Sequence, residues 1–353
     1  MKTYLTFFNA RDGDRSYMKA AIIGVGAMGR RHISASRYAG LDVAGICDLS
    51  PQCLKLAEQE WGVPAARHYQ NPVEMLSTVS PDVVIVSTTT PSHCELVCLA
   101  AEKGAKYILC EKPMASSLAE CDRMIEVCKK HGTLLGINHQ RRFAEQSQFI
   151  KRFVQEKRFG GIISMNVVAG NMGIAMNGSH FIEAFNFLTD EVPINVEAWL
   201  DNSDMPNPRG EQFRDAAGQL RMTTASGKRF YLDCGVAQGH GIFLTYSCKN
   251  GRIGFDEFSG KMTLVHRQQE YLDEPTSRYC CPWAEEVFKI KPLDIVESTG
   301  NLLKNMFMGA DYPDAVCGRR VVAALVATWI SHEEGRLVKI DDNLPLDRYF
   351  AWA

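Results

Sequence analysis

Short apolar runs alternate with amphipathic segments through the first 140 residues. Strands are predicted at residues 19–24, 41–47, 83–87, 107–110 and 133–137, where the runs are too short for buried helices. Helices are predicted at residues 28–38, 51–60, 94–103 and 118–130, the last with Leu118, Cys121, Ile125 and Cys128 on one face. This order predicts βαβ units that build a parallel sheet.

The pattern changes beyond residue 140. Strands are predicted at residues 162–169, 196–200, 220–224, 228–234, 242–247 and 252–255, with few helices between them. We therefore expect a large, mostly antiparallel open sheet. Asn250-Gly251 predicts a two-residue hairpin with positive φ values. Helices are expected at residues 180–188 and 313–334.

The length of 353 residues favours two domains. We expect an α/β domain over residues 18–140 and an α+β domain for substrate binding and oligomerisation over residues 141–353. Residues 1–17 precede the first strand as an extension of unknown role, and Met18 is a second possible start.

Composition and charge narrow the class of protein. The net charge of −2 excludes the basic surface that binding to nucleic acid requires. We find neither an apolar run of about eighteen residues nor a signal-peptide pattern, so we expect a cytoplasmic protein without a membrane span. The twelve cysteines include no C-x-x-C pair, which favours free thiols in a reducing compartment and predicts no metal site.

A glycine-rich turn follows the first strand and opens the first helix. It reads Gly24-Val25-Gly26-Ala27-Met28-Gly29, a G-x-G-x-x-G fingerprint in the context that dinucleotide binding needs. The glycines permit the tight turn, the approach of a pyrophosphate and the close packing of helix and strand. The pattern predicts a Rossmann domain; the alternative is a glycine-rich turn without a ligand.

Asp48 ends the second strand, nineteen residues after Gly29. This offset suits a carboxylate that binds the ribose hydroxyls of the cofactor and repels a 2′-phosphate. We therefore expect NAD, with NADP less favoured, although Arg30 and Arg31 stand nearby. The alternative for Asp48 is a helix N-cap.

Three further segments carry a family resemblance. Glu111-Lys112-Pro113 follows the strand at 107–110, after a polar loop that contains Thr88 with His93 beyond it. Asn138-His139-Gln140-Arg141-Arg142-Phe143 reads N-x-x-R-R-F, and residues 318–336 form a final helix with a closing segment. Together with the fingerprint, these motifs resemble the Gfo/Idh/MocA family (glucose-fructose oxidoreductase and inositol 2-dehydrogenase) over residues 19 to 340.

The resemblance implies roles for individual residues. It places Thr88, His93, Glu111 and Lys112 along the cofactor, and it suggests a cis Lys112–Pro113 bond. Lys112 would also be catalytic, because its ammonium can stabilise alkoxide charge on the substrate. The alternative for Lys112 is an exposed lysine in a turn.

The same resemblance makes His180 the catalytic base. Its imidazole, with an ordinary pKa of about 6.5, suits proton abstraction from an alcohol. Met176, however, stands where many relatives carry Asp, and methionine cannot accept a proton. A packed or helix-capping role for His180 therefore stays open.

The leading hypothesis is an NAD-dependent dehydrogenase that transfers a hydride between nicotinamide and a secondary alcohol or ketone of a sugar, cyclitol or nucleotide-sugar. The alternatives are a non-catalytic NAD-binding sensor or accessory protein, and a glycosidase-type relative that uses NAD transiently. An open antiparallel sheet leaves one face to cover, which predicts a homodimer or homotetramer.

Overall fold

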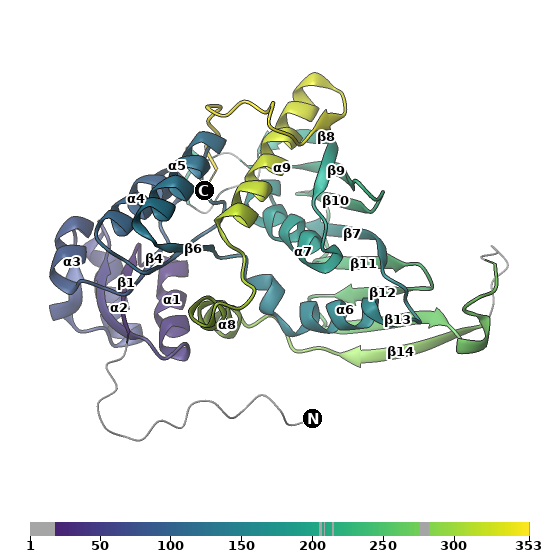
Figure 1. Ribbon diagram of the computed structural model, residues 1–353, viewed down its shortest axis with the longest axis horizontal. Helices are drawn as coiled ribbons and strands as arrows, with labels where there is room; N and C mark the ends of the chain where they lie inside the picture. The colour runs from purple at the N-terminus through teal and green to yellow at the C-terminus, as the bar shows by residue number, and fades with distance from the viewer. Residues whose placement is uncertain (1–17, 205–206, 208, 214, 276–281, 353) are drawn as a thin grey trace, which may run out of the picture.

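The computed structural model describes residues 18–204, 207, 209–213, 215–275 and 282–352. The predicted extension, residues 1–17, lies outside the described part of the chain. Two sheets with their covering helices make up the fold, and Figure 1 shows them side by side along the long axis of the molecule.

The first sheet has six parallel strands in the order β3-β2-β1-β4-β5-β6. This is the order of a Rossmann sheet, with the switch point between β1 and β4, so the prediction of a parallel α/β domain is confirmed. The strands are β1 (Lys19–Ile23), β2 (Asp42–Cys47), β3 (His68–Tyr69), β4 (Val83–Val86), β5 (Tyr107–Cys110) and β6 (Leu134–Ile137). The two-residue β3 is too short to give an apolar pattern, and the sequence did not locate it.

Helices cover both faces of this sheet. One face packs against α1 (Ala27–Tyr38), α2 (Pro51–Trp61) and α8 (Ile295–Met308), and the other against α3 (Pro72–Val79), α4 (His93–Glu102) and α5 (Leu118–His131). Within β1, Ala20 and Ile22 are buried in the core on the side of α1, α2 and α8. Ala21 and Ile23 are buried in the core on the side of α3, α4 and α5. A strand buried on both faces reads as a continuous apolar run, which is why the sequence showed these strands clearly.

Helix α8 comes from the C-terminal half of the chain but packs on the Rossmann sheet. Its residues Leu302, Leu303 and Met306 are buried in the core that also holds Ile22. A Cβ on Gly300 would lie 2.3 Å from the ring of Tyr38, so the absence of a side chain lets α8 approach α1 closely. The sequence did not predict α8, and its position shows that residues 141–353 do not all pack as one unit.

The second sheet has nine strands in the order β14-β13-β12-β11-β7-β10-β9-β8-β15. All neighbouring pairs are antiparallel except β7 with β10, so the prediction of a mostly antiparallel sheet is confirmed. The strands are β7 (Ile162–Gly170), β8 (Pro193–Asp204), β9 (Ala216–Thr224), β10 (Arg229–Gly235), β11 (Phe243–Cys248), β12 (Gly251–Asp256), β13 (Lys261–Arg267), β14 (Trp283–Lys289) and β15 (Val338–Lys339).

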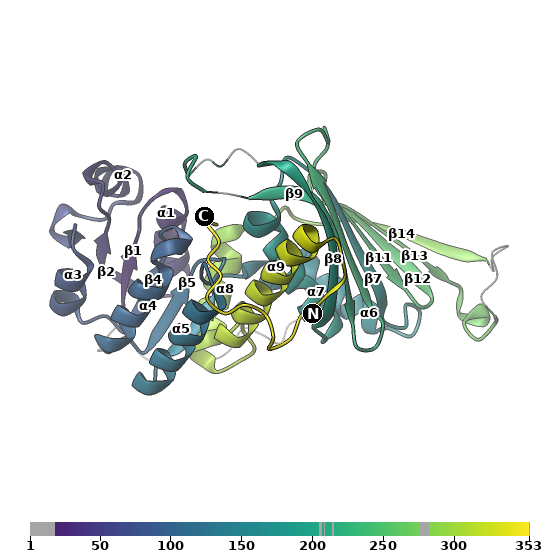
Figure 2. The same ribbon diagram turned by 90° about the horizontal axis from the view of Figure 1, so that it is seen from above.

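One face of the second sheet is covered by α6 (Glu145–Gln155), α7 (Ser179–Thr189) and α9 (Ala315–Glu334), which contribute to one apolar core. Figure 2 shows no described helix on the opposite face. Trp199, Phe243 and Val287 are exposed there, with 58%, 42% and 56% of their surface accessible, while the residues next to them in their strands are more buried. This open face is the one that the sequence predicted.

The β11–β12 hairpin is present, but the expected backbone of its turn is not. Neither Asn250 nor Gly251 has a positive φ. The turn instead docks on the preceding loop, where Gly160 and Gly161 take the left-handed conformation and Asn250 donates through its side chain to the Lys157 carbonyl (3.0 Å). Gly251 serves close approach, since a Cβ there would lie 2.5 Å from the Val265 carbonyl oxygen.

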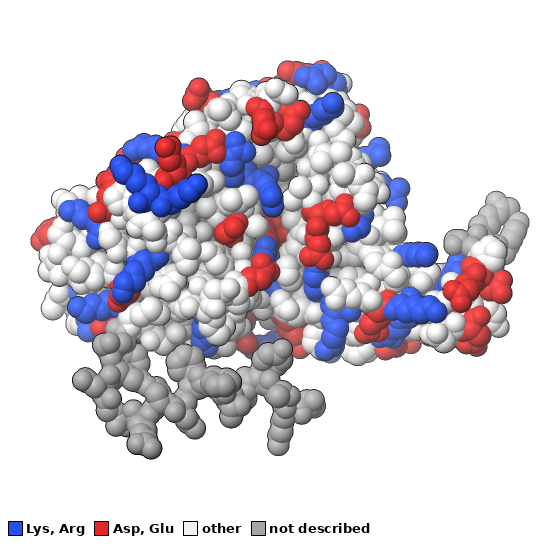
Figure 3. Space-filling model, viewed as in Figure 1, with Lys and Arg blue, Asp and Glu red and all other residues white. Residues whose placement is uncertain are grey.

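The charge of the surface and the length of the helices bear on binding to nucleic acid and on insertion into a membrane. Figure 3 shows Lys and Arg side chains interspersed with Asp and Glu on the viewed face, as the net charge of −2 leads one to expect. Among the described residues, α9 and the other helices are all too short or too polar to cross a membrane.

Candidate active site

The fingerprint turn connects β1 to α1 and hydrogen-bonds to the end of β2. Gly24 has a φ of +87°, and its N–H donates to the Cys47 carbonyl (2.8 Å). The Ser87 hydroxyl donates to the Gly24 carbonyl (2.7 Å), and a Cβ on Gly24 would lie 2.9 Å from the Ser87 backbone. Glycine is therefore needed at position 24 for two reasons. Its positive φ is unfavourable for other residues, and a side chain there would collide with the Ser87 backbone.

The other two glycines differ in what a side chain would meet. A Cβ on Gly29 would lie 1.9 Å from the Gly24 carbonyl oxygen, so Gly29 is needed for the packing of α1 against the turn. A Cβ on Gly26 would meet no protein atom within 4 Å. Gly26 is the N-cap of α1, so Ala27 and Met28 begin the helix beside an open cradle. This cradle fits the pyrophosphate of a dinucleotide, which binds unpaired N–H groups at a helix N-terminus.

Asp48 lies beside this cradle. Its two carboxylate oxygens accept hydrogen bonds from the Val25 N–H and the Ser50 N–H, both at 2.8 Å. The N-cap of α2 is Ser50, so Asp48 does not take the capping position that was its alternative role. Each carboxylate oxygen can accept a further bond, and the half-buried group is positioned where a ribose hydroxyl can donate to it.

His93 is fully buried, whereas Thr88 is only half-buried. Only 1% of the His93 surface is exposed, and its ring nitrogens lie 3.0 Å from the Pro113 carbonyl and 3.3 Å from the Thr88 carbonyl. Burial lowers the pKa of His93 below its ordinary value. The imidazole therefore links the loop after β4 to the turn after β5, whereas Thr88 is half-buried and hydrogen-bonds to Ser92 (2.7 Å).

Glu111 is the centre of a buried polar network. Its Oε1 lies 2.7 Å from His32 Nε2 on α1 and accepts from Asn138 Nδ2 at 2.8 Å, while Oε2 accepts from the Lys112 N–H at 3.2 Å. Burial alone would raise the pKa of Glu111, but the hydrogen bond from His32 and the nearby positive charges lower it to about 2. Glu111 is therefore ionised, and it joins the fingerprint helix to the turn that carries Lys112.

Lys112 reaches from the Rossmann domain into the second domain. The Lys112–Pro113 bond is cis, as the family resemblance suggested. Only 8% of the Lys112 surface is exposed, and Nζ donates to the Met176 carbonyl (2.6 Å). Burial lowers the pKa of Lys112 to about 8, with Arg209 and Arg141 acting in the same direction and Glu111 and Asp215 opposing them. The alternative of an exposed lysine in a turn is wrong.

Met176 thus contributes through its backbone. It lies in a π-helical turn (Ile174–Gly178) directly before α7, and its carbonyl accepts from the Lys112 ammonium. The polar contact at this position therefore does not require an acidic side chain.

His180 lies in the first turn of α7, next to the ring of His139. The two rings meet edge to face, with centroids 5.7 Å apart, and Nδ1 of each ring has no hydrogen-bond partner. Burial, with Lys112 next, lowers the pKa of His139 to about 3 and that of His180 well below its ordinary value. Both imidazoles are therefore neutral, and the positive charge of Lys112 contributes to keeping them so.

The two arginines of the N-x-x-R-R-F segment tie the domains together. Arg142 pairs with Glu183 of α7 and with Asp311, and Arg141 pairs with Glu257 and lies over the Phe181 ring at 4.5 Å. Glu183 is therefore engaged in a buried ion pair, which supports a structural role for this acid.

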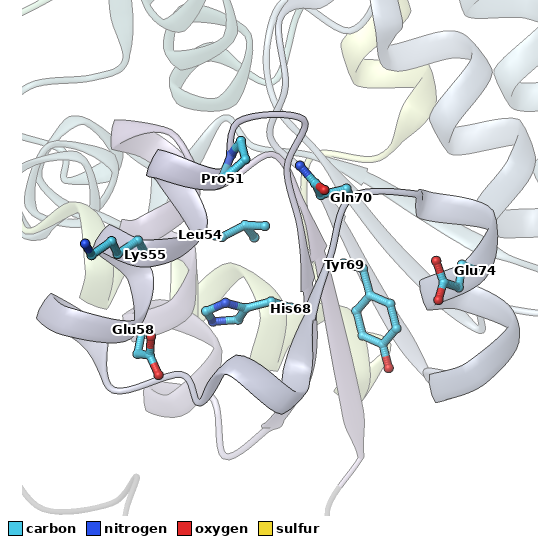
Figure 4. A pocket seen from close by; sticks show the side chains of 8 residues that line it. All are labelled: Pro51, Leu54, Lys55, Glu58, His68, Tyr69, Gln70 and Glu74. Atoms are coloured by element: carbon cyan, nitrogen blue, oxygen red, sulfur yellow. The ribbon is translucent and has the colours of Figure 1, made fainter.

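Within the part of the chain that the structure describes, neither a metal centre nor the hollow between α2, β3 and α3 coincides with these residues. Among the described residues, no group of three or more His, Cys, Asp or Glu side chains is placed to hold a metal ion. A hollow of about 460 Å³ lies between α2, β3 and α3, and Figure 4 shows its lining. None of its residues belongs to the predicted site: Pro51, Leu54, Lys55, Glu58, His68, Tyr69, Gln70 and Glu74.

Sequence reasoning missed His32 and Asp215. His32 stands one helical turn after Gly29, and Asp215 accepts backbone hydrogen bonds from Ala175 and Met176. Each contacts the site from a distant part of the chain, and neither belongs to a motif. A histidine on the buried side of the fingerprint helix was the only signal, and it pointed equally to core packing.

Comparison with known proteins identifies the family. The model described as "Oxidoreductase family, NAD-binding Rossmann fold" matches residues 18–139. The D-apiose dehydrogenase of Paraburkholderia graminis is 31% identical over 347 residues, which cover 91% of this chain and 89% of that protein. The chain belongs to the Gfo/Idh/MocA family. It is therefore an NAD-binding oxidoreductase of the dehydrogenase type, and the predictions of family, enzyme class and cofactor are confirmed.

Further relatives agree with this family. The myo-inositol 2-dehydrogenase of Thermotoga maritima is 34% identical over 146 residues, 40% of this chain and 42% of that protein. The structure of a levoglucosan dehydrogenase in complex with NADH has a TM-score of 0.77 at 18% identity and covers 92% of this chain and 99% of that chain. At this identity the structural likeness shows the fold alone.

The two glycines that flank the cradle give a matched test of cofactor binding. In this oxidoreductase, Gly26→Val places a side chain in open space, so we expect an unchanged melting temperature without NAD and an affinity for NAD at least about tenfold lower. Gly29→Ala should lower both, because its Cβ collides with the Gly24 carbonyl. Calorimetric titration with NAD and thermal melting measure the two effects. Wild-type affinity in Gly26→Val would show that the pyrophosphate does not bind this turn.

Proposed function

We propose that this protein oxidises a secondary alcohol of a sugar or cyclitol, with transfer of a hydride to NAD, and catalyses the reverse reduction of the ketone. The observation that carries the proposal is the position of Lys112, which lies at the carboxyl end of β5 and is buried where the Rossmann domain meets the turn before α7 of the second domain. Ligands of open α/β sheets bind at this edge.

The substrate class is supported by the relatives. The proteins most similar to this chain include a D-apiose dehydrogenase and inositol 2-dehydrogenases, which are named for polyhydroxylated substrates. An oxidoreductase role is thus better supported than a sensor or glycosidase-type role. A turnover assay on each class distinguishes a sugar, a cyclitol and a nucleotide-sugar as the substrate.

The cofactor site combines the predicted residues. Gly24, Gly26, Ala27, Met28 and Gly29 would surround the pyrophosphate, and Asp48 would accept from the ribose. Thr88 would border the nicotinamide side, and His93 and Glu111 would position the two loops that lead to Lys112. NAD, when bound, supplies the hydride acceptor.

The protein's contribution to the chemistry is proton transfer. His180 was predicted to take the hydroxyl proton; burial lowers its pKa well below its ordinary value, so that the imidazole is neutral. Lys112, with a pKa of about 8, is closer to neutral pH and thus better matched to exchanging the proton. We therefore assign proton transfer to the Lys112 amine, while neutral His180 hydrogen-bonds to the substrate oxygen.

The direct test is turnover on a panel of substrates. Purified protein with NAD and D-apiose, other aldoses or inositols should produce the absorbance of reduced nicotinamide with at least one of them. Lys112→Met should lower kcat/KM on that substrate by about 10² to 10⁴, the usual contribution of general acid–base catalysis. Lys103→Met, which replaces a lysine bound only to Ser77 on the surface, is the matched control. Full turnover by Lys112→Met would exclude the assigned role.

The pH dependence tests which group moves the proton. Oxidation needs the unprotonated amine of Lys112, so kcat/KM for oxidation should rise with pH and level off above about 8. Reduction needs the ammonium and should fall over the same range. Initial rates in both directions, measured from about pH 6 to 10, give the two profiles. Opposite trends would assign the titrating proton to another group.

We also propose that a second copy of this chain covers the open face of the second sheet. Register pairs place Trp199 of β8 and Phe243 of β11 on the same face, separated in their row by Gln219, Asp233 and Val168 of β9, β10 and β7. Large apolar side chains that are exposed on an uncovered face favour association with another surface. The described cysteines are free thiols, which fits the reducing cytoplasm that the sequence suggested.

Replacement of the two aromatic residues tests this interface. Trp199→Glu with Phe243→Glu should convert a dimer or tetramer into smaller species, because charge on both copies would be buried. Light scattering at micromolar concentration measures the mass, and Lys55→Glu at an exposed position of α2, away from the second sheet, is the control. A wild-type monomer would contradict the proposal.

A further inference from the structure

A carboxylate from the second domain lies directly behind the contact of Lys112. Asp215, which precedes β9, has 2% of its surface exposed. One oxygen accepts from the Ala175 N–H and the other from the Met176 N–H, both at 2.8 Å. These two amides belong to the π-helical turn whose Met176 carbonyl accepts from Lys112 Nζ at 2.6 Å. Asp215 thus holds the two peptide units that directly precede that acceptor.

The backbone in front of the turn makes room for this carboxylate. A Cβ on Gly173 would lie 2.0 Å from Asp215 Oδ2. Gly173 has a φ of −92°, which any residue can adopt, so space rather than conformation demands glycine here. The glycine and the carboxylate therefore form one fitted contact.

Several charged or titratable groups face Lys112. Glu111 comes from the Rossmann domain and is engaged by His32 and Asn138. Arg141 and Arg209 oppose the ammonium, His139 and His180 are neutral, and Asp215 favours the ammonium from the second domain. Of the carboxylates that act on Lys112, Asp215 is the one that also binds the turn holding the Lys112 acceptor.

We propose that Asp215 is a positioning residue that holds the Met176 carbonyl against Lys112, and so determines where the Lys112 amine receives and delivers its proton. This inference rests on the proposed function of Lys112. It also explains how a site with methionine at position 176 obtains a carboxylate, which comes from a separate element of the chain.

The substitution Asp215→Asn removes two contributions of this carboxylate, its negative charge and one of its two hydrogen-bond acceptors. An amide oxygen can replace one acceptor, but the amide NH₂ faces the second N–H and cannot accept from it. The turn must shift, and a negative charge near Lys112 is lost. The loss of this charge lowers the pKa of Lys112, because it removes a group that favours the ammonium.

The experiment measures the pKa of Lys112 without any substrate. Full-length protein is labelled with acetic anhydride at a series of pH values, and acetylation of Lys112 relative to exposed lysines is measured by peptide mass spectrometry. Asp215→Asn should move the midpoint to lower pH by roughly half a unit or more. Asp294→Asn, at the N-cap of α8, is the matched control and should leave the midpoint unchanged.

Gly173→Ala disturbs the same carboxylate by a second route and should shift the midpoint too, so the test survives if Asp215→Asn fails to fold. On the best substrate, Asp215→Asn should lower kcat about 10-fold to 100-fold with little change in KM. A wild-type midpoint in a folded Asp215 or Gly173 variant would overturn the inference. A shifted midpoint in a protein that turns over no alcohol would support this inference while removing the proposed substrate.

Discussion

The contact between the Lys112 ammonium and the Met176 carbonyl is the interaction on which the site depends. It joins the end of β5 in the Rossmann domain to the turn before α7 in the second domain. A buried ammonium is costly unless it is paired and hydrogen-bonded, so both domains must present their partners at once. The Rossmann domain supplies the ionised Glu111 next to Lys112, and the second domain supplies the carbonyl that Asp215 holds.

Glu111 connects this contact to the cofactor cradle. The same carboxylate binds His32 on the fingerprint helix, Asn138 after β6 and the backbone N–H of Lys112. A displacement of α1 would therefore be transmitted to Lys112 through one buried group. Hydrogen bonds from three elements to one buried carboxylate fix the positions of these elements relative to one another.

Glycines permit close approach of the backbone at three places in and around the site. Gly29 lets α1 pack on the fingerprint turn, Gly173 admits the Asp215 carboxylate, and Gly300 brings α8 against α1. In none of these places is a positive φ involved. The glycines are needed because a methyl group would separate the surfaces that position Lys112 and the cradle, and cores of this density do not absorb such a volume without rearrangement.

Elements with a local signal could be predicted from the amino-acid sequence. The apolar runs of the parallel strands, the fingerprint of Gly24 to Gly29 and the Glu111-Lys112-Pro113 turn depend on neighbours within a few residues, and they predicted the Rossmann domain and its cofactor edge. Which distant groups meet at that edge became known from the folded chain alone. His32 lies 79 residues from Glu111, Asp215 lies about 40 residues from the turn it holds, and α8 returns to a sheet formed by the first half of the chain. The Asn250-Gly251 turn shows the same limit, because docking on Gly160 and Gly161 overrode its local preference. Patterns along the chain record the burial of each segment, but they do not record which partner buries it.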